Sequence, residues 1–206
     1  MARHGTRQLR IIGGRWRGRR LRFAAVRHLR PTSDRNRETL FNWLQPRLPG
    51  ARCLDLFAGS GALGFEAASR GAAEVVMVEQ ARAAVSILRD NVRLLGADNI
   101  HVRQCDALRL LDGPSSEFDI VFLDPPFEST MLEACCARLD QRGWLHPGAC
   151  IYVETGSRQG LPALPAGWTV WRQRTAGQVL YALLRVPGNE QAGHDILQSS
   201  DDTGEM

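Results

Sequence analysis

The chain has 206 residues, which fits one domain and leaves little room for a second. Hydrophobic residues make up 44% and charged residues 23%, as in ordinary globular proteins, and this composition excludes a chain that is disordered throughout. The net charge is only +4, but residues 1–37 hold twelve arginines and a single acid, Asp34. This end of the molecule is therefore expected to meet an anionic partner.

Residues 1–30 are predicted to form a small basic arm. Three glycines interrupt its short apolar stretch, a pattern that favours a hairpin. The arginines are interleaved with Trp16 and Phe23, and this mixture suits phosphate contacts combined with stacking on bases. Any other polyanion would suit the arginines equally well, and a solvated basic surface without a partner is the alternative.

Residues 31–186 are predicted to form an α/β domain. Residues 31–34 supply N-cap side chains for a helix that ends before Pro46. From residue 51 onward, short apolar strands alternate with amphipathic helices, which indicates a mostly parallel sheet with helices on both faces. The expected strands are 53–57, 74–78, 100–103, 118–123 and 149–153, and the expected helices are 62–69, 81–95 and 131–142.

The end of the chain departs from this alternation. Two β-rich runs, 168–174 and 178–186, are joined by a short turn that contains Gly177, which predicts a terminal antiparallel hairpin. Residues 187–206 contain five acids, no arginine and few large apolar side chains. We expect this tail to be disordered.

A glycine-rich turn follows the first strand of the α/β domain. The segment Asp55-Leu-Phe-Ala-Gly59-Ser60-Gly61-Ala-Leu-Gly64 lies between that strand and the next helix. Glycines there let the backbone approach a ligand, and the free N–H groups at the start of the helix point outward. The turn predicts a nucleotide-like cofactor, but its glycine spacing alone would describe an NAD site equally well.

Three carboxylates at consecutive strand ends narrow the choice of cofactor. Glu79 ends the second strand, where an acid can accept both ribose hydroxyls, and Asp106 follows the third, where an acid can accept from the adenine amino group. Asp55 precedes the glycine turn, where a carboxylate would repel a pyrophosphate but attract the amino group of a methionine moiety. The predicted cofactor is therefore S-adenosylmethionine. Each acid taken alone could instead be a solvated loop residue or a helix cap.

The strand 118–123 ends in Asp124-Pro125-Pro126-Phe127. An exocyclic amino group of a nucleobase is a poor nucleophile because its lone pair is delocalised into the ring. The Asp124 carboxylate and the Pro125 carbonyl oxygen can each accept one N–H and orient the nitrogen toward a methyl group. The prolines keep the turn rigid, and Phe127 offers a flat face to a base that has left its stack. An ordinary proline-rich loop is the alternative interpretation.

The cysteine spacing and the lack of long apolar runs bear on metal binding, on membrane contact and on the cellular compartment. The five cysteines form no CxxC pair, so we expect reduced thiols in the core, no zinc site and no other metal. The N-terminus lacks the apolar segment of a signal peptide, and no run approaches the roughly 18 apolar residues of a membrane span. We therefore expect a cytoplasmic protein with no membrane contact, and, since no exposed apolar patch is evident, a monomer.

Two constellations of motifs resemble a known family. The glycine turn and the Asp-Pro-Pro-Phe motif together are similar to those of class I methyltransferases, in the branch that methylates amino nitrogens. Two further segments, Arg10-Ile-Ile-Gly-Gly-Arg-Trp-Arg-Gly-Arg19 and Arg30-Pro-Thr-Ser-Asp-Arg-Asn-Arg-Glu-Thr-Leu-Phe-Asn-Trp-Leu44, resemble the bacterial 16S ribosomal RNA guanine-N2 methyltransferases that modify guanine 966. The resemblance runs from about residue 9 to residue 186.

The resemblance implies a seven-stranded Rossmann-like sheet, an N-terminal hairpin arm that grips RNA, and 16S ribosomal RNA in a small-subunit assembly particle as substrate. It also implies that residues 32–38 pack over the cofactor pocket, with Arg37 as a partner for the methionine carboxylate. The expected cofactor-binding residues are Asp55, Phe57, Ala58, Gly59, Ser60, Gly61, Glu79, Gln80, Asp106, Ala107 and Arg37. The expected RNA-binding residues are Arg10, Arg15, Trp16, Arg17, Arg19, Arg20 and Arg22, and the expected catalytic residues are Asp124, Pro125, Pro126 and Phe127.

Three other functions fit parts of the sequence. Tetrapeptides related to Asp-Pro-Pro-Phe also occur in enzymes that methylate adenine N6 in DNA or a glutamine amide in proteins. DNA enzymes of that kind usually need a further domain that recognises the target, and a chain of this length has no room for one. An RNA-binding assembly factor could keep the fold without the chemistry, but the intact Asp124 and Gly59 argue against it. An NAD-linked oxidoreductase would share the glycine turn.

Overall fold

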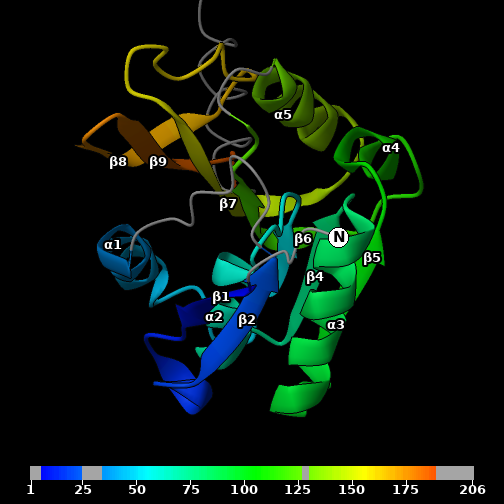
Figure 1. The fold of residues 1–206 in the computed structure, drawn as a ribbon. Coiled ribbons are helices and arrows are strands. Elements are labelled where there is room, and N and C mark those ends of the chain that lie inside the picture. Colours follow the sequence, from blue (N-terminus) through cyan, green and yellow to red (C-terminus); the bar gives the residue numbers. More distant parts are fainter. Residues whose placement is uncertain (1–5, 25–33, 127–129, 189–206) are drawn as a thin grey trace, which may run out of the picture.

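The computed structural model describes residues 6–24, 34–126 and 130–188. Its centre is a seven-stranded sheet in the order β5-β4-β3-β6-β7-β9-β8 (Figure 1). The first five of these strands run parallel, and β9 pairs antiparallel with both β7 and β8. The expected α/β fold, with its C-terminal antiparallel hairpin, is therefore confirmed. The strands are β3 (Arg52–Asp55), β4 (Glu74–Glu79), β5 (Ile100–Gln104), β6 (Phe118–Leu123), β7 (Leu145–Gly156), β8 (Thr169–Ala176) and β9 (Val179–Arg185).

Helices cover both faces of the sheet, as the continuous apolar strands require. One core cluster joins α1, α2 and α3 to side chains such as Cys53 and Phe122, while the other joins α4 and α5 to their neighbours Leu54 and Leu123. Successive strand residues thus point into opposite clusters. The helices are α1 (Asp34–Leu44), α2 (Ala62–Ser69), α3 (Arg82–Leu95), α4 (Ala107–Leu111) and α5 (Met131–Gln141).

The predicted N-terminal hairpin is present and docks as an outer layer. It consists of β1 (Thr6–Arg10), the short 3-10 turn η1 (Gly14–Trp16) and β2 (Arg20–Ala24), with β1 and β2 antiparallel. Figure 1 shows it lying against α2 and α3. Its apolar side chains, among them Leu9, Leu21 and Phe23, are buried in the cluster on that face, so the arm is part of the folded core.

The strand order of the sheet reverses at β3. The chain runs outward from β3 to β4 and β5 and then returns to β6 on the other side of β3. In sheets of this kind a ligand binds beyond the carboxyl ends of the strands, where the strand order reverses. The turns after β3 and β6, which carry the two predicted motifs, therefore lie side by side.

Two local predictions needed correction, and two others lie outside the described residues. Helix α4 was not expected, because five residues are too few to show a helical periodicity. Strand β7 is longer than expected and starts at Leu145, with an irregularity in its pairing to β6. The predicted boundary at residue 30 and all but the first two residues of the tail 187–206, which was predicted to be disordered, fall outside the described ranges. Within those ranges, no helix is long and apolar enough to cross a membrane.

Candidate active site

The glycine turn after β3 is folded so that only glycine fits at its key positions. Gly59 and Gly61 both adopt positive φ, at 50° and 80°, a region that other residues rarely enter. A Cβ on Gly61 would also lie 2.5 Å from the Phe65 ring, so the close approach of the turn to α2 excludes any side chain. Gly61 directly precedes α2, and the N–H groups in the first turn of a helix have no acceptor within the helix, so this end of α2 can donate to other groups or to a ligand.

Asp55 lies beneath this turn, at the end of β3. Its side chain is buried and accepts a hydrogen bond from Gly64 N at 3.1 Å. Burial raises the pKa of Asp55 to about 7, and the nearby Glu79 carboxylate also raises it, although backbone N–H donors from Gly64 and Phe57 act in the opposite direction. A group with this pKa is held partly neutral and would gain from a cationic ligand.

Glu79 and Asp106 lie at the ends of the next two strands, and both carboxylates accept hydrogen bonds from backbone N–H groups. Glu79 accepts from Gly59 N at 2.9 Å and from Ala81 N at 2.7 Å, and thereby ties the glycine turn to the end of β4. Asp106 caps α4 by accepting from Arg109 N at 3.0 Å. A carboxylate can accept about four hydrogen bonds, so these bonds orient both groups and leave them able to accept from a ligand.

The Asp124-Pro125-Pro126 turn follows β6 and forms one wall of a pocket. The pocket has a volume of about 170 Å³ and is also lined by the start of α5, by Glu154 and Thr155 of β7, and by residues 159–162. It is smaller than the roughly 300–1,000 Å³ of typical small-molecule sites. Phe127, the last residue of the predicted motif, lies outside the described residues.

Asp124 also has an altered acidity. Its side chain keeps partial access to solvent but is surrounded mostly by protein. Burial raises the pKa of Asp124 well above its usual value, and the carboxylates of Glu154 and Asp55 raise it further. Asp124 therefore lies close enough to Asp55 and Glu154 to interact electrostatically with both, which links the end of β6 to the ends of β3 and β7. Such perturbed groups in a cleft mark a candidate active site.

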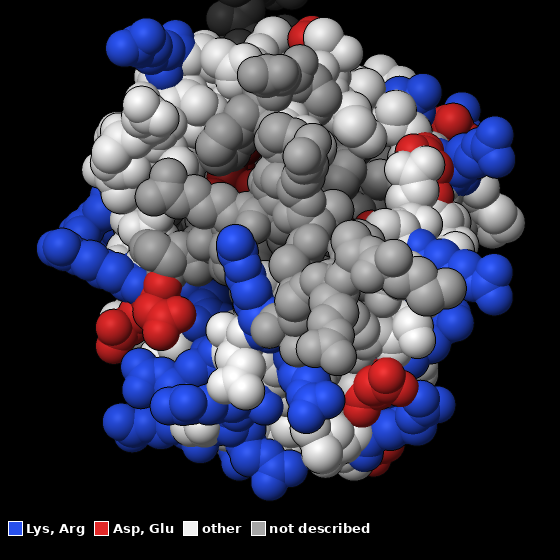
Figure 2. Space-filling model, viewed as in Figure 1, with Lys and Arg blue, Asp and Glu red and all other residues white. Residues whose placement is uncertain are grey.

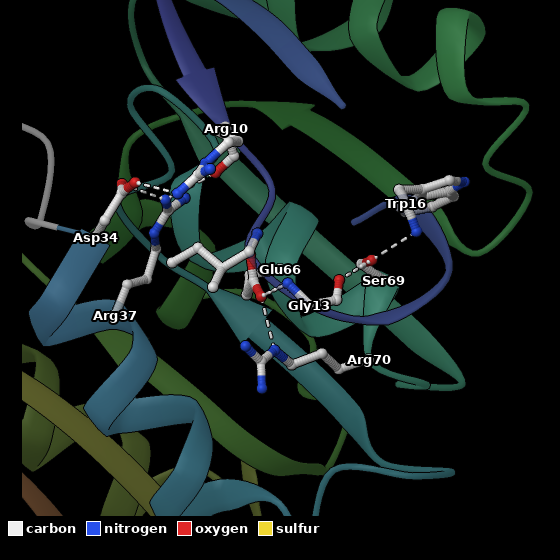
Figure 3. Close-up of polar contacts among 9 residues, drawn as sticks. Arg10, Gly13, Trp16, Asp34, Arg37, Glu66, Ser69 and Arg70 are labelled. Carbon is white, nitrogen blue, oxygen red and sulfur yellow. Dashed lines mark hydrogen bonds and ion pairs between the residues drawn. The ribbon is translucent and has the colours of Figure 1, made fainter. Parts of the chain in front are cut away.

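Arg37 of α1 is the largest fully buried side chain, at 1% exposure. Its Nη2 donates to the Arg10 carbonyl oxygen at 2.8 Å and to Asp34 Oδ1 at 2.7 Å (Figure 3). Its Nε and Nη1 have no hydrogen-bond partner among the described residues, and burial lowers the pKa of Arg37. Two buried donors are thus left for a further acceptor beside the hairpin.

The predicted RNA-binding residues all lie on the docked hairpin. Trp16 N donates to Ser69 Oγ at 3.0 Å (Figure 3). The guanidinium of Arg15 lies over the Trp16 ring, 4.0 Å from its centroid. Arg15, Arg19 and Arg10 also contact protein groups, namely Asn99, the Leu94 carbonyl and Asp34. The side chains of Arg17, Arg20 and Arg22 are exposed and have no ion pair with a described residue. Figure 2 shows arginines gathered over the part of the surface where Figure 1 places the hairpin.

Comparison with known proteins identifies the family to which the chain belongs. A family described as conserved hypothetical protein 95 matches residues 9–185. The ribosomal RNA small subunit methyltransferase D of Escherichia coli is 49% identical over 179 residues, covering 87% of this chain and 90% of that protein. Its counterpart in Haemophilus influenzae is 43% identical over 180 residues, covering 85% and 93%. The chain belongs to this family.

Solved structures agree with the family match. An Escherichia coli protein described as a candidate methyltransferase superposes with a TM-score of 0.82 at 45% identity and covers 89% of this chain and 100% of its own. A methylase from Haemophilus influenzae superposes with a TM-score of 0.75 at 40% identity. The expected membership of a ribosomal RNA methyltransferase family is thereby confirmed, and the family match ends at residue 185, before the acidic tail.

The sequence analysis did not identify several residues that hold the hairpin or lie at the pocket. Glu66 and Ser69 on α2 hold the hairpin, while on β7 Glu154 lines the pocket and accepts a hydrogen bond from Tyr152. Glu66 looked like an ordinary helix acid. The signal for Glu154 was an acid at the end of an otherwise apolar strand, in a position equivalent to that of Asp124.

Proposed function

We propose that the chain transfers a methyl group from S-adenosylmethionine to the exocyclic N2 amino group of a guanine in 16S ribosomal RNA. The observation that carries this proposal is the pairing of β3 with β6, which sets the glycine turn beside the Asp124 turn. A cofactor turn and an acceptor for an amino group are what such a transfer needs at one place. The ribosomal RNA small subunit methyltransferases among the relatives support the choice of substrate.

The residues at the edge fit S-adenosylmethionine. Buried Asp55, with its raised pKa, suits the amino group of the methionine moiety, and Glu79 and Asp106 have remaining acceptor capacity for ribose hydroxyls and the adenine amino group. The two unpartnered donors of Arg37 suit the methionine carboxylate. Around these anchors, Phe57, Ala58, Gly59, Ser60, Gly61, Gln80 and Ala107 would line the cofactor.

The amino group of the base would be activated by position. When bound, the cofactor would supply a methyl group whose bond to the sulfonium sulfur breaks as the N–C bond forms, so that a neutral thioether leaves and the amino nitrogen gives up one proton. Asp124 and the Pro125 carbonyl oxygen would each accept one N–H of the amino group, directing the nitrogen lone pair at the methyl carbon. Pro125 and Pro126 offer no backbone N–H that could compete for the carboxylate. We assign Phe127 the stacking role that its sequence position predicts.

The RNA would approach across the hairpin. We assign the phosphate contacts to its arginines, Arg10, Arg15, Arg17, Arg19, Arg20 and Arg22, and a stacking contact to Trp16. By the family likeness, the target is guanine 966 in a small-subunit assembly particle. From the sequence features given above, we also propose that the enzyme acts as a monomer in the cytoplasm.

A transfer assay on several substrates tests this function. Tritium from labelled cofactor should appear in 16S ribosomal RNA or small-subunit particles, and mass mapping of ribosomal RNA from cells lacking the protein should show one guanine without its methyl group. Label that appears only on duplex DNA or on a protein would exclude the proposed substrate.

Replacement of the catalytic carboxylate tests the mechanism. Asp124→Ala removes one acceptor of the amino group, so turnover should fall by at least about 100-fold, as with other preorganised hydrogen-bonding groups. RNA affinity, measured by filter binding, should change little because the hairpin is untouched. Normal turnover in this variant would contradict the mechanism.

A further inference from the structure

Glu154 lies beside Asp124 at the pocket and has no part in the chemistry described above. Leu123 of β6 pairs in register with Val153 of β7, so Asp124 and Glu154 occupy the next positions of two neighbouring parallel strands. The side chain of Glu154 is 5% exposed and lines the same pocket as the two prolines of the motif. A second, nearly buried carboxylate thus borders the space where the target base would lie.

Tyr152 holds this carboxylate in a defined orientation. Its hydroxyl donates to Glu154 Oε1 at 2.6 Å in a buried hydrogen bond. Burial raises the pKa of Tyr152 well above its usual value, and the adjacent Glu154 carboxylate raises it further, so the hydroxyl stays protonated and remains a donor. Since a carboxylate can accept about four hydrogen bonds, Tyr152 fixes Glu154 without removing its ability to accept from a base.

We propose that Glu154 accepts the N1–H of the target guanine and that this contact determines which base is methylated. In guanine, N1–H is adjacent to the N2 amino group, so its two neighbouring donors match two neighbouring carboxylates. In adenine, the ring nitrogen beside the amino group is an acceptor, and its lone pair would face a carboxylate. The inference rests on the proposed function and adds base specificity to it.

Electrostatics gives this arrangement its selectivity. Asp124 and Glu154 are neighbouring carboxylates in a poorly solvated place, and Glu154 raises the pKa of Asp124. A base that donates to both carboxylates compensates their desolvation. A base that donates to Asp124 but turns a lone pair toward Glu154 gives the nearly buried Glu154 carboxylate no hydrogen bond. Such binding is strongly unfavourable.

The base analogue 2-aminopurine isolates the contact, because it keeps the 2-amino group but has an acceptor at N1. We would ligate synthetic segments carrying guanine or 2-aminopurine at the target position into 16S ribosomal RNA, assemble particles, and measure kcat/KM for tritium transfer. The unaltered enzyme should prefer guanine by at least about 100-fold, since sites built to accept a hydrogen bond reject analogues that lack the donor.

Glu154→Gln is the decisive variant. An amide can either accept from N1–H or donate to N1, so the preference should drop below about 10-fold. The 2-aminopurine base also lacks O6, but this affects both enzymes alike, so the change in preference reports on N1. Tyr152→Phe, which keeps the buried ring, should give an intermediate preference. Glu74→Gln removes a half-buried carboxylate at the start of β4, whereas Glu154 lies near the end of β7. This control variant should leave the preference unchanged.

The outcomes separate the inference from the function on which it rests. A preference for guanine that is unchanged in Glu154→Gln would overturn the inference while leaving the function intact. If Glu154→Gln fails to fold, an unchanged preference in Tyr152→Phe would overturn the inference in the same way. If the unaltered enzyme transfers no methyl group to guanine in any particle or RNA, the proposed function fails, and the inference fails with it.

Discussion

Asp55 shows how burial sets the chemistry of a single residue. Its pKa of about 7 in the fold is above its ordinary value of 3.8, because the side chain is enclosed at the end of β3. The folded state therefore favours the neutral form. The stability that this preference contributes is fully present below about pH 4 and is lost as the pH rises through 7. A bound ammonium group would reverse the preference by stabilising the carboxylate.

Cofactor binding should therefore release a proton from Asp55. Between about pH 5 and 7 the free enzyme holds Asp55 protonated, so the affinity for S-adenosylmethionine should rise by up to about tenfold per pH unit and level off above pH 7. Calorimetry in two buffers of different ionisation enthalpy measures the proton count. Asp55→Asn should bind more weakly and show no such pH dependence. Equal slopes for the two proteins would assign the proton to another group.

At the scale of elements, a buried carboxylate joins the hairpin to α2. Glu66 is fully buried and accepts from Ile12 N at 2.9 Å, from Gly13 N at 2.8 Å and from Arg70 Nε at 2.6 Å (Figure 3). A Cβ at Gly13 would lie 2.6 Å from the Arg70 guanidinium, so glycine allows this approach. Ser69 completes the joint by donating to the Gly13 carbonyl oxygen at 2.6 Å.

Loss of the Glu66 charge should loosen the hairpin. In Glu66→Gln one acceptor oxygen is replaced by an amide donor that faces other donors, so the free energy of unfolding should fall by about 2–4 kcal/mol. Hydrogen exchange of the Ile12 and Gly13 amides should accelerate more than that of the central strands. The control is Glu74→Gln, whose partly exposed pair with Arg52 should contribute only about 0–1 kcal/mol. Equal losses in the two variants would refute a special role for Glu66.

At the scale of the whole molecule, the exposed arginines are distributed unevenly. The hairpin presents exposed arginines on one side of the active-site edge, and Arg172 and Arg174 of β8 form a smaller exposed basic set at the far edge of the sheet. Binding through phosphate contacts weakens with salt in proportion to the number of phosphates neutralised. The slope of affinity against salt therefore reports which arginines meet RNA.

Removal of three hairpin arginines should flatten that slope. For Arg17→Ala combined with Arg20→Ala and Arg22→Ala, the log-log slope should decrease by up to about 2, at roughly 0.7 for each phosphate of a single strand. Filter binding to 16S ribosomal RNA between low and moderate salt measures it. Arg172→Ala with Arg174→Ala lowers the net charge on the other edge and should leave the slope nearly unchanged. A larger effect from the β8 pair would move the RNA contact away from the hairpin.

The sequence predicted much of this architecture because local patterns carry it. Helix α2 begins and ends where the pattern placed it, at Ala62 and Ser69, since a glycine turn precedes it and Gly71 follows. The two motif turns were likewise readable, because each lies directly after an apolar strand.

What the sequence could not predict depends on tertiary contacts. Nothing near Glu66 in the chain indicates that a hairpin more than fifty residues away supplies its partners. Glu154 acquires its place only because β7 pairs in register with β6, and the burial of Arg37 depends on the docking of β1. Helix α4 is stabilised by a cap and by burial of Ala107 and Leu111, and its length hides it from any periodicity.

Helix α2 has a consequence for communication across the molecule. Its first turn leaves the glycine turn at Gly61, and its last turn holds the hairpin through Glu66 and Ser69. At 1.5 Å per residue the helix is only about 12 Å long, and the proposed function puts the cofactor at one end of it and RNA at the other. Any coupling of the two ligands through α2 must be reciprocal, so each would change the affinity for its counterpart by the same factor.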